Sequence, residues 1–269
     1  MIGIFDSGFG GLAVFREIAK ALPEFDYIYL GDNARAPYGH LSQDIIYDYT
    51  KQAIDYLFAK NCDLIILACN TVSAEALRKL QQEYLPAKYP GKNVLGIIRP
   101  LVEVAASKTS NKKIAILGTR STIESNSYPK ELQEQNPDIQ VVQQACPLLA
   151  PLVEESQEDT AAAKIILENY LQPLKNQDFD TLILGCTHYS FFHDQIAAFF
   201  GQHVKIIENG SIIAAKLADY IKRHPEFAQP TEIEPQRIFL TTDDNQKFDL
   251  AAKKFLGREI KSQKINLIT

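Results

Sequence analysis

The 269-residue chain has no tryptophan, a single methionine and only four cysteines. The cysteines (Cys62, Cys69, Cys146 and Cys186) form no C-x-x-C pair, and no His/Cys group has the spacing of a zinc site. The sequence therefore gives no sign of a disulfide framework or of a metal centre. So few cysteines in a chain of this length are typical of a reduced, cytoplasmic protein, and we predict that compartment.

Long apolar runs and an excess of basic residues are missing as well. No segment approaches the roughly 18 apolar residues of a membrane span, and the N-terminus MIGIFDSG lacks the regions of a signal peptide. We therefore expect no membrane association. The net charge of −5 argues against a nucleic-acid partner, which would require a basic stripe. With 46% hydrophobic residues, the chain can bury a sizeable core as one large domain or two small ones.

Short apolar runs alternate along the chain with segments of helical spacing. The expected strands are 2–5, 27–30, 64–68, 94–98, 113–117, 139–142, 181–184, 204–207 and 237–240. The expected helices are 12–22, 44–60, 73–84, 123–135, 160–171, 193–200, 212–223 and 245–255. This alternation predicts an α/β fold whose mainly parallel sheets are covered by helices on both faces.

Two of the strand ends repeat each other, as LIILACNT at 64–71 and LILGCTHY at 182–189. Each segment closes the third strand of its own set of strands. The repeat predicts two similar lobes, related by a pseudo-twofold axis, with the active site between them. We assign residues 1–98 and 211–269 to the first lobe and residues 99–210 to the second.

Polar side chains follow the strand ends, where ligands bind in open α/β sheets. The groups in these places are Asp6-Ser7, Cys69-Asn70-Thr71, Thr119 with Thr122, and Cys186-Thr187-His188. If the lobes face each other, so do Cys69 and Cys186. One thiol could then remove a proton from a substrate while the other supplies a proton to the opposite face. A helix N-terminus after each strand would stabilise a thiolate, as would a protonated His188 beside Cys186.

A purely structural role is the alternative for each of these cysteines. A lone cysteine after a buried strand is more often a small core residue than a base. Packing gives no reason, however, for both repeats to keep cysteine followed by hydroxyl and amide groups, so we favour function for the pair. Cys62 and Cys146 lie outside the repeat and are expected to be structural.

The DSGFGG segment at 6–11 is similar to a glycine-rich phosphate loop. It matches neither G-x-G-x-x-G nor a P-loop, so the similarity is weak. We expect a strand-to-helix turn at which Ser7 and glycine N–H groups could meet a carboxylate.

Taken together, these motifs resemble the glutamate racemases of the cofactor-independent aspartate/glutamate racemase family. The matching segments are FDSGFGGL at 5–12, GDNARAPYG at 31–39, ACNTVSA at 68–74, GTRSTIESNSY at 118–128, PLVEES at 151–156 and LGCTHY at 184–189. They run in the family's order and cover nearly the whole chain. The resemblance implies interconversion of L- and D-glutamate without a cofactor, which supplies D-glutamate for peptidoglycan.

The resemblance also implies roles for individual residues. It makes Cys69 the base for D-glutamate and Cys186 the base for L-glutamate, with Asp6, Glu154 and His188 assisting. The substrate-binding residues that it implies are Asp6, Ser7, Tyr38, Gly39, Asn70, Thr71, Thr119, Thr122, Thr187 and His188. It also favours a homodimer.

The chain departs from the family pattern in three places. His40-Leu41 follows PYG where Arg or Lys is usual, Arg99-Pro100 stands where Glu-Pro is common, and Thr241-Thr242-Asp243 replaces TGD. None of these involves a proposed base. The chain also starts directly before its first expected strand, so we expect it to lack the N-terminal extension of the branch activated by a nucleotide-linked peptidoglycan precursor.

Two other functions remain open at this point. One is another reaction of the same superfamily, such as aspartate or hydantoin racemisation or a decarboxylation. The other is a non-catalytic protein that clamps an amino acid between two lobes, which would not need paired thiols. The circular dichroism of L-glutamate, followed with the protein and no cofactor, distinguishes between them.

Overall fold

The structure is a computed structural model that describes residues 1–231 and 234–267. Its strands form two separate sheets, and every strand pairing is parallel. The first sheet has the order β10-β9-β2-β1-β3-β4 and consists of β1 (Ile2–Asp6), β2 (Tyr27–Gly31), β3 (Leu64–Leu67), β4 (Asn93–Gly96), β9 (Arg237–Thr241) and β10 (Gln263–Lys264). The second has the order β6-β5-β7-β8 and consists of β5 (Lys113–Gly118), β6 (Gln140–Ala145), β7 (Thr181–Gly185) and β8 (Lys205–Ile207).

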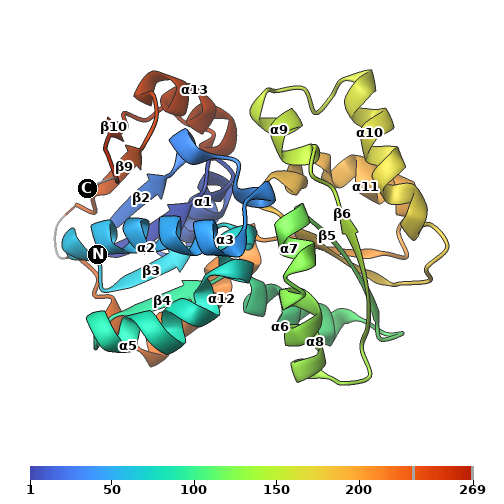
Figure 1. The fold of residues 1–269 in the computed structure, drawn as a ribbon, viewed down its shortest axis with the longest axis horizontal. Coiled ribbons are helices and arrows are strands. Elements are labelled where there is room, and N and C mark those ends of the chain that lie inside the picture. Colours follow the sequence, from blue (N-terminus) through green and yellow to red (C-terminus); the bar gives the residue numbers. More distant parts are fainter. Residues whose placement is uncertain (232–233, 268–269) are drawn as a thin grey trace.

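Helices flank both sheets, so the predicted two-lobed α/β fold is confirmed (Figure 1). The helices are α1 (Gly11–Ala21), α2 (Gln43–Ala59), α3 (Asn70–Glu75), α4 (Leu77–Lys79), α5 (Leu85–Lys88), α6 (Ile98–Lys108), α7 (Arg120–Glu124), α8 (Ser127–Gln135), α9 (Leu149–Glu154), α10 (Ala161–Leu171), α11 (His193–Phe200), α12 (Gly210–Arg223) and α13 (Asn245–Leu256). Short 3₁₀ turns are η1 (Asn33–Arg35), η2 (Tyr38–His40), η4 (Gln172–Leu174), η5 (Thr187–Phe192) and η6 (Pro225–Phe227), and η3 (Leu80–Tyr84) is a π-helical turn.

The two sheets repeat one arrangement of strands. The order β2-β1-β3-β4 in the first sheet matches β6-β5-β7-β8 in the second. Strands β3 and β7, which precede Cys69 and Cys186, therefore occupy equivalent places. The later strands β9 and β10 join the first sheet only, beyond β2. Our division of the chain at 98/99 and 210/211 stays a prediction, and its residues 232–233 and 268–269 lie outside the described residues.

Apolar side chains point to both faces of the first sheet, which explains why helices cover both faces. Ile2 and Ile4 of β1 belong to one buried cluster, which they share with α1, α12 and α13, whereas Phe5 belongs to a second cluster with α2. Successive side chains of a strand point to opposite faces, so β1, β2, β3 and β9 each contribute to both clusters. None of the helices in the described ranges is long and apolar enough to cross a bilayer.

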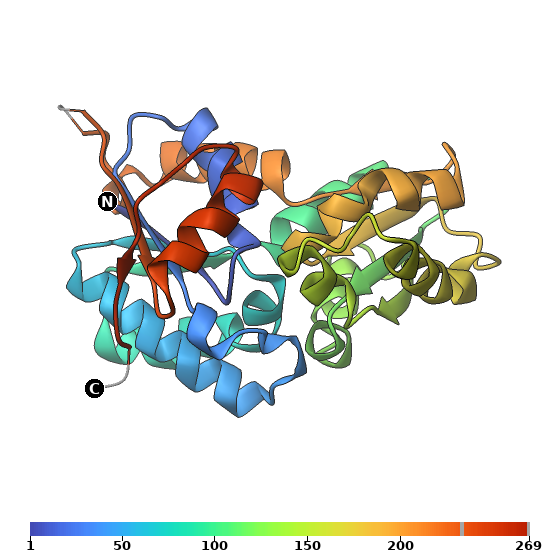
Figure 2. The same ribbon diagram turned by 90° about the horizontal axis from the view of Figure 1, so that it is seen from above.

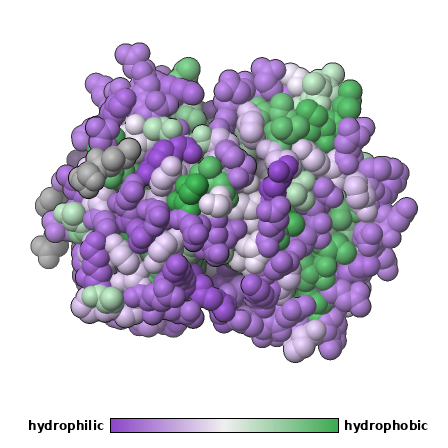
Figure 3. All heavy atoms as spheres, viewed as in Figure 1, coloured by the Kyte–Doolittle hydropathy of each residue, from purple (hydrophilic) through white to green (hydrophobic). Residues whose placement is uncertain are grey.

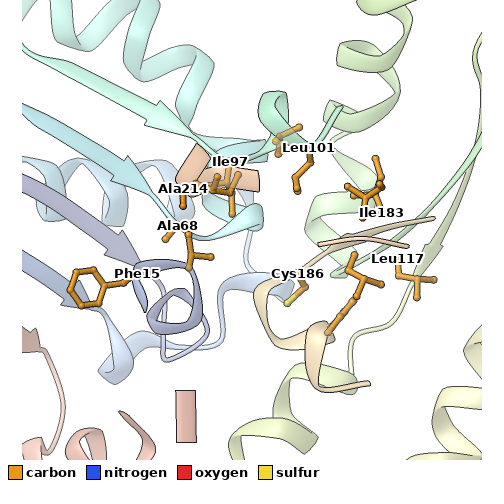
Figure 4. Packing of buried hydrophobic residues seen from close by; sticks show 14 of the residues in the cluster. Phe15, Ala68, Ile97, Leu101, Leu117, Ile183, Cys186 and Ala214 are labelled. Atoms are coloured by element: carbon orange, nitrogen blue, oxygen red, sulfur yellow. The ribbon is translucent and has the colours of Figure 1, made fainter. Parts of the chain in front are cut away.

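The larger cluster joins the lobes. Figure 4 shows Phe15, Ala68 and Ala214 on one side, Leu117 and Ile183 on the other, and Ile97 and Leu101 between them. Residue Ile97 directly precedes α6, Leu101 lies on it, and Ala214 lies on α12. The lobes are therefore joined by a packed apolar layer, which brings the two strand ends close to each other.

Several helix predictions were wrong in their extents. The prediction missed α6 and α9, each of which has a proline in its first turn (Pro100, Pro151), where an N–H has no intrahelical partner to lose. The expected helix 123–135 is divided, because Asn126 adopts the left-handed conformation between α7 and α8. The expected strand 94–98 ends at Gly96, because Ile98 already begins α6.

Candidate active site

The two repeated cysteines lie against one small cavity between the lobes. Cys69 follows β3 and precedes α3, and Cys186 follows β7 and precedes η5. They are 8% and 7% exposed, and neither is in a disulfide. The cavity has a volume of about 30 Å³. Its lining consists of Asp6, Ser7, Ala36, Pro37, Tyr38, Gly39, Cys69, Asn70, Thr71, Thr119, Ala150, Glu154, Cys186, Thr187 and His188.

The structure thus gathers all but one of the residues singled out from the sequence. The exception, Thr122, is fully buried behind the lining and does not itself face the cavity. Sequence reasoning missed Ala36, Pro37 and Ala150, which have no reactive group that could have marked them. Among the described residues, no group of three or more His, Cys, Asp or Glu side chains could hold a metal ion.

Cys186 is the first member of a chain of three titratable groups. Its Sγ lies 3.7 Å from Nδ1 of His188, whose Nε2 lies 3.0 Å from Oε1 of Glu154. Burial alone would lower the pKa of His188, but its contacts with Cys186 and Glu154 raise that pKa to about 10. His188 is therefore an imidazolium at neutral pH. A cation beside a cysteine sulfur stabilises the thiolate, so this arrangement favours a base at Cys186.

Cys69 lies in the opposite electrostatic setting. Burial, and next the Asp6 carboxylate, raise the pKa of the Cys69 thiol to about 12. Ser7 Oγ lies 3.3 Å from Cys69 Sγ. Burial also raises the pKa of Asp6, against the opposing effect of His188, and the Gly8 N–H donates to Asp6 Oδ1 at 2.9 Å. Cys69 is consequently a neutral thiol at neutral pH and carries a proton to donate.

Hydroxyl and amide groups form much of the rest of the cavity wall. Thr71, Thr119 and Thr122 form a triangle of hydroxyls with Oγ1–Oγ1 distances of 2.9, 3.2 and 2.9 Å. Asn70 accepts a hydrogen bond of 2.7 Å from Tyr128, yet its buried Nδ2 has no acceptor among the described residues. A buried donor without a partner is costly, which favours a ligand that supplies an acceptor, such as a carboxylate.

Three glycines bring the first lobe against the second. A Cβ at Gly10 would lie 2.2 Å from Thr187 Oγ1 and 2.6 Å from the His188 ring, and a Cβ at Gly39 would lie 2.7 Å from Thr119 Cβ. At Gly8 the nearest atom would be Oε1 of Glu154, at 3.1 Å. Gly8 and Gly10 belong to the segment that is similar to a phosphate loop, and they allow the two lobes to come into close contact.

We expect Gly10→Ala to lower kcat/KM by about tenfold and also to lower the thermal stability. Gly10 has φ −59° and ψ −35°, which alanine adopts without strain, so the loss comes from the clash of the methyl group with buried Thr187 and His188. Activity falls because the methyl group holds Thr187 and His188 away from the first lobe. Steady-state kinetics and thermal unfolding measure the two effects. A variant that is both stable and fully active would show that the lobes need not meet at Gly10.

A much larger groove also crosses the lobe boundary, but its lining includes none of the candidate site residues singled out from the sequence. It has a volume of about 1280 Å³ and is lined mainly by residues of α3, α4, η3, α6, α7, α8 and α12. Several of its acidic and basic side chains pair with one another, for example Arg78 with Glu131 and Glu134. Its lining contains no cysteine and no histidine. The small cavity is therefore the better candidate for the active site.

Comparisons with known proteins show what the chain is similar to. The family model Asp/Glu/Hydantoin racemase matches residues 2–217. A glutamate racemase of Sulfurihydrogenibium sp. is 42% identical over 99% of this chain and 97% of its own. Crystal structures of glutamate racemases from Bacillus anthracis (TM-score 0.92, 35% identity) and from Francisella tularensis in complex with D-glutamate (TM-score 0.89, 30% identity) each cover 99% of this chain and 97% of their own.

Proposed function

The chain belongs to the Asp/Glu/Hydantoin racemase family, and from this premise we propose that it interconverts L- and D-glutamate by a two-base reaction at Cα that needs no cofactor. The observation that carries the proposal is the pair of free cysteines, one from each repeat, which line one cavity in unlike electrostatic surroundings. An imidazolium accompanies Cys186, and a buried carboxylate accompanies Cys69. A base and an acid on opposite sides of Cα are what inversion of a stereocentre requires.

The proton balance of the proposed reaction is simple. The Cys186 thiolate takes the Cα proton of L-glutamate, and the Cys69 thiol gives its own proton to the opposite face, which yields D-glutamate. Cys186 then carries the proton and Cys69 is the thiolate, which is the state needed for the reverse reaction. Asp6, Glu154 and His188 assist these transfers. The assignment of Cys186 to L-glutamate and Cys69 to D-glutamate follows the family resemblance.

The remaining lining residues are proposed to bind the substrate. Ser7, Tyr38, Gly39, Asn70, Thr71, Thr119 and Thr187 would hold its carboxylates and ammonium group with Asp6 and His188, and Thr122 would orient Thr71 and Thr119. The unpartnered Nδ2 of Asn70 supports a carboxylate in this place. The cavity has room for only one or two water molecules, so the lobes must part to admit a substrate.

Circular dichroism tests the activity directly. We expect the signal of either pure enantiomer of glutamate to decay to zero with the protein alone, since enantiomers have equal free energies. Aspartate under the same conditions is the control for substrate choice. A stable signal with glutamate would overturn the proposed function.

Deuterium oxide tests the two-base mechanism. We expect D-glutamate formed from L-glutamate to carry deuterium at Cα from the first turnover, while the remaining L-glutamate stays largely protiated, because the thiol that donates has exchanged with solvent. Mass spectrometry of the separated enantiomers measures this. Substantial protium in the early product would mean that one base returns the proton that it removed.

Three further proposals accompany the activity. The chain would supply D-glutamate for peptidoglycan, and it would work in the cytoplasm, where both thiols stay reduced.

We also propose a homodimer. Figure 3 shows apolar side chains gathered over the right-hand lobe, where Figure 1 draws α9 and α10, and Leu148 and Ile165 there are 50% and 60% exposed. Light scattering after gel filtration measures the mass in solution, and a monomer would contradict the dimer.

A further inference from the structure

The segment from β9 to α13 lies beyond the residues matched by the family model, yet it touches both walls of the site. Figure 1 and Figure 2 show α13 above the first sheet, with one end directed toward the second lobe. Its contacts occur at two places. One is Thr242, directly after β9, and the other is Lys254-Phe255, at the end of α13.

Thr242 holds the loop that forms the first-lobe wall of the cavity. Its hydroxyl donates to Oδ1 of Asp32 at 2.8 Å and accepts from the N–H of Ala34 at 3.0 Å. Asp32 is fully buried, and its Oδ2 accepts from Arg35 Nε at 2.6 Å and from the Tyr38 hydroxyl. One carboxylate therefore links Thr242 to the Tyr38–Gly39 wall.

This contact depends on one of the departures in the sequence. Thr242 is the middle residue of Thr-Thr-Asp, where the family pattern has glycine. A glycine has no hydroxyl with which to bridge Asp32 and Ala34. Hydrogen bonds to a buried carboxylate are stronger than those between neutral groups, so the bridge restrains the loop effectively.

Lys254 and Phe255 hold the second-lobe wall. Lys254 Nζ donates to the carbonyl of Val153 at 2.7 Å and pairs with Glu158 Oε1 at 2.6 Å. Val153 lies in the last turn of α9, directly before Glu154, and a cation there stabilises the end of the helix. The fully buried Phe255 ring meets the His188 ring edge-on, with 5.6 Å between centroids.

From these contacts we propose that the C-terminal segment Arg237–Leu256 holds both walls of the active site, with Thr242 and Lys254 as its positioning residues. Thr242 fixes the substrate loop through Asp32, and Lys254 fixes the helix that presents Glu154 to His188. The inference rests on the proposed racemase function only for its kinetic readouts. Its structural readout is independent of any substrate.

The first variant removes the hydroxyl at the beginning of the segment. Thr242→Val should raise KM for both enantiomers about tenfold and leave kcat nearly unchanged, because the loop binds substrate but moves no proton. Thr242→Ser keeps the hydroxyl and should restore KM. Hydrogen–deuterium exchange without substrate should show faster exchange across 32–41 in Thr242→Val alone.

The second variant removes the cation at the other end. Lys254→Met should lower kcat about tenfold, because the Glu154–His188 pair loses its alignment. Lys254→Arg should recover most of the rate, and exchange across 149–158 should rise only in Lys254→Met. The matched control is Lys253→Met on the same helix. This change removes an exposed ion pair with Glu259 and should alter neither kcat nor the exchange rate. If Lys254→Met unfolds because Glu158 is left unpaired, Lys254→Met/Glu158→Gln replaces it.

The outcomes separate this inference from the proposed function. If the wild-type protein does not racemise glutamate but hydrogen–deuterium exchange responds as described, the proposed activity is wrong and the positioning role is supported. If the wild type racemises, and both folded variants keep wild-type KM, kcat and exchange protection, the positioning role is overturned. Variants that only melt at lower temperature, with unchanged kinetics and exchange, would assign the segment to packing alone.

Discussion

Replacing either Cys69 or Cys186 by alanine should lower the rate of racemisation by at least about a thousandfold, in both directions. Each variant lacks either the base or the acid of the proposed reaction. Since kcat/KM must be equal for two enantiomers of equal free energy, loss of either thiol blocks both directions. The fold should survive, because each side chain is small. Circular dichroism of glutamate gives the rate, and thermal unfolding reports the fold.

The chain contains its own matched controls. Cys62 and Cys146 are buried like Cys69 and Cys186 but do not line the cavity, and Cys62→Ala and Cys146→Ala should keep wild-type kinetics. Cys69→Ser and Cys186→Ser should fail nearly as badly as the alanine variants, because a serine hydroxyl is a far weaker acid than a thiol. Full activity in Cys69→Ala or Cys186→Ala would remove the two-base mechanism.

The sequence predicted where the polar strand-end residues lie because their placement depends on local features. A buried parallel strand is a short apolar run, and the residues directly after it lie at the edge where ligands bind. Cys69 with Asn70 and Cys186 with His188 could be placed by this rule alone. The repeat then related the two edges to each other, and the parallel sheets of the structure follow the same order in both lobes.

Other features of the site depend on residues far apart in the chain, and local patterns do not reveal them. From the sequence, the DSGFGG motif resembles an anion-binding loop only weakly. In the structure, a glycine is needed at position 10 because Thr187 and His188 occupy the space beside it. Asp32 has no signal of its own, since its partner Thr242 lies 210 residues away. Lys254 likewise reads as one of several lysines on an amphipathic helix. Its contact with Val153 exists only once the lobes have come together.

The two thiols have unlike surroundings, so the site is asymmetric although the fold repeats. Among the described residues, Cys186 contacts His188, which pairs with Glu154, and Cys69 has no such pair beside it. Its neighbours are Ser7 and Asp6, and the pKa of Asp6 is raised by burial. Without substrate, a cation already lies beside Cys186 and a carboxylate beside Cys69, and this arrangement favours the direction in which Cys186 is the base. The asymmetry should be visible when His188 is changed.

We expect His188→Asn to lower kcat about ten- to a hundredfold in the direction in which Cys186 acts as the base, and much less in the other. The imidazolium, whose own pKa of about 10 keeps it charged throughout the neutral range, is replaced by a neutral amide of similar size. The thiolate of Cys186 then loses its nearest cation, and each pKa unit of lost stabilisation is worth about tenfold in the population of that base.

The equilibrium between the enantiomers sets a strict condition on this result. Because the variant cannot change the L/D ratio, kcat/KM must fall equally in both directions, so the asymmetry appears only when kcat and KM are measured separately from each pure enantiomer. His193→Asn is the matched control, since that histidine pairs with Glu208 outside the cavity and should leave all four constants unchanged. Wild-type kcat in both directions for His188→Asn would show that His188 only packs at the start of η5, because a group that stabilises one thiolate must affect the direction that uses it.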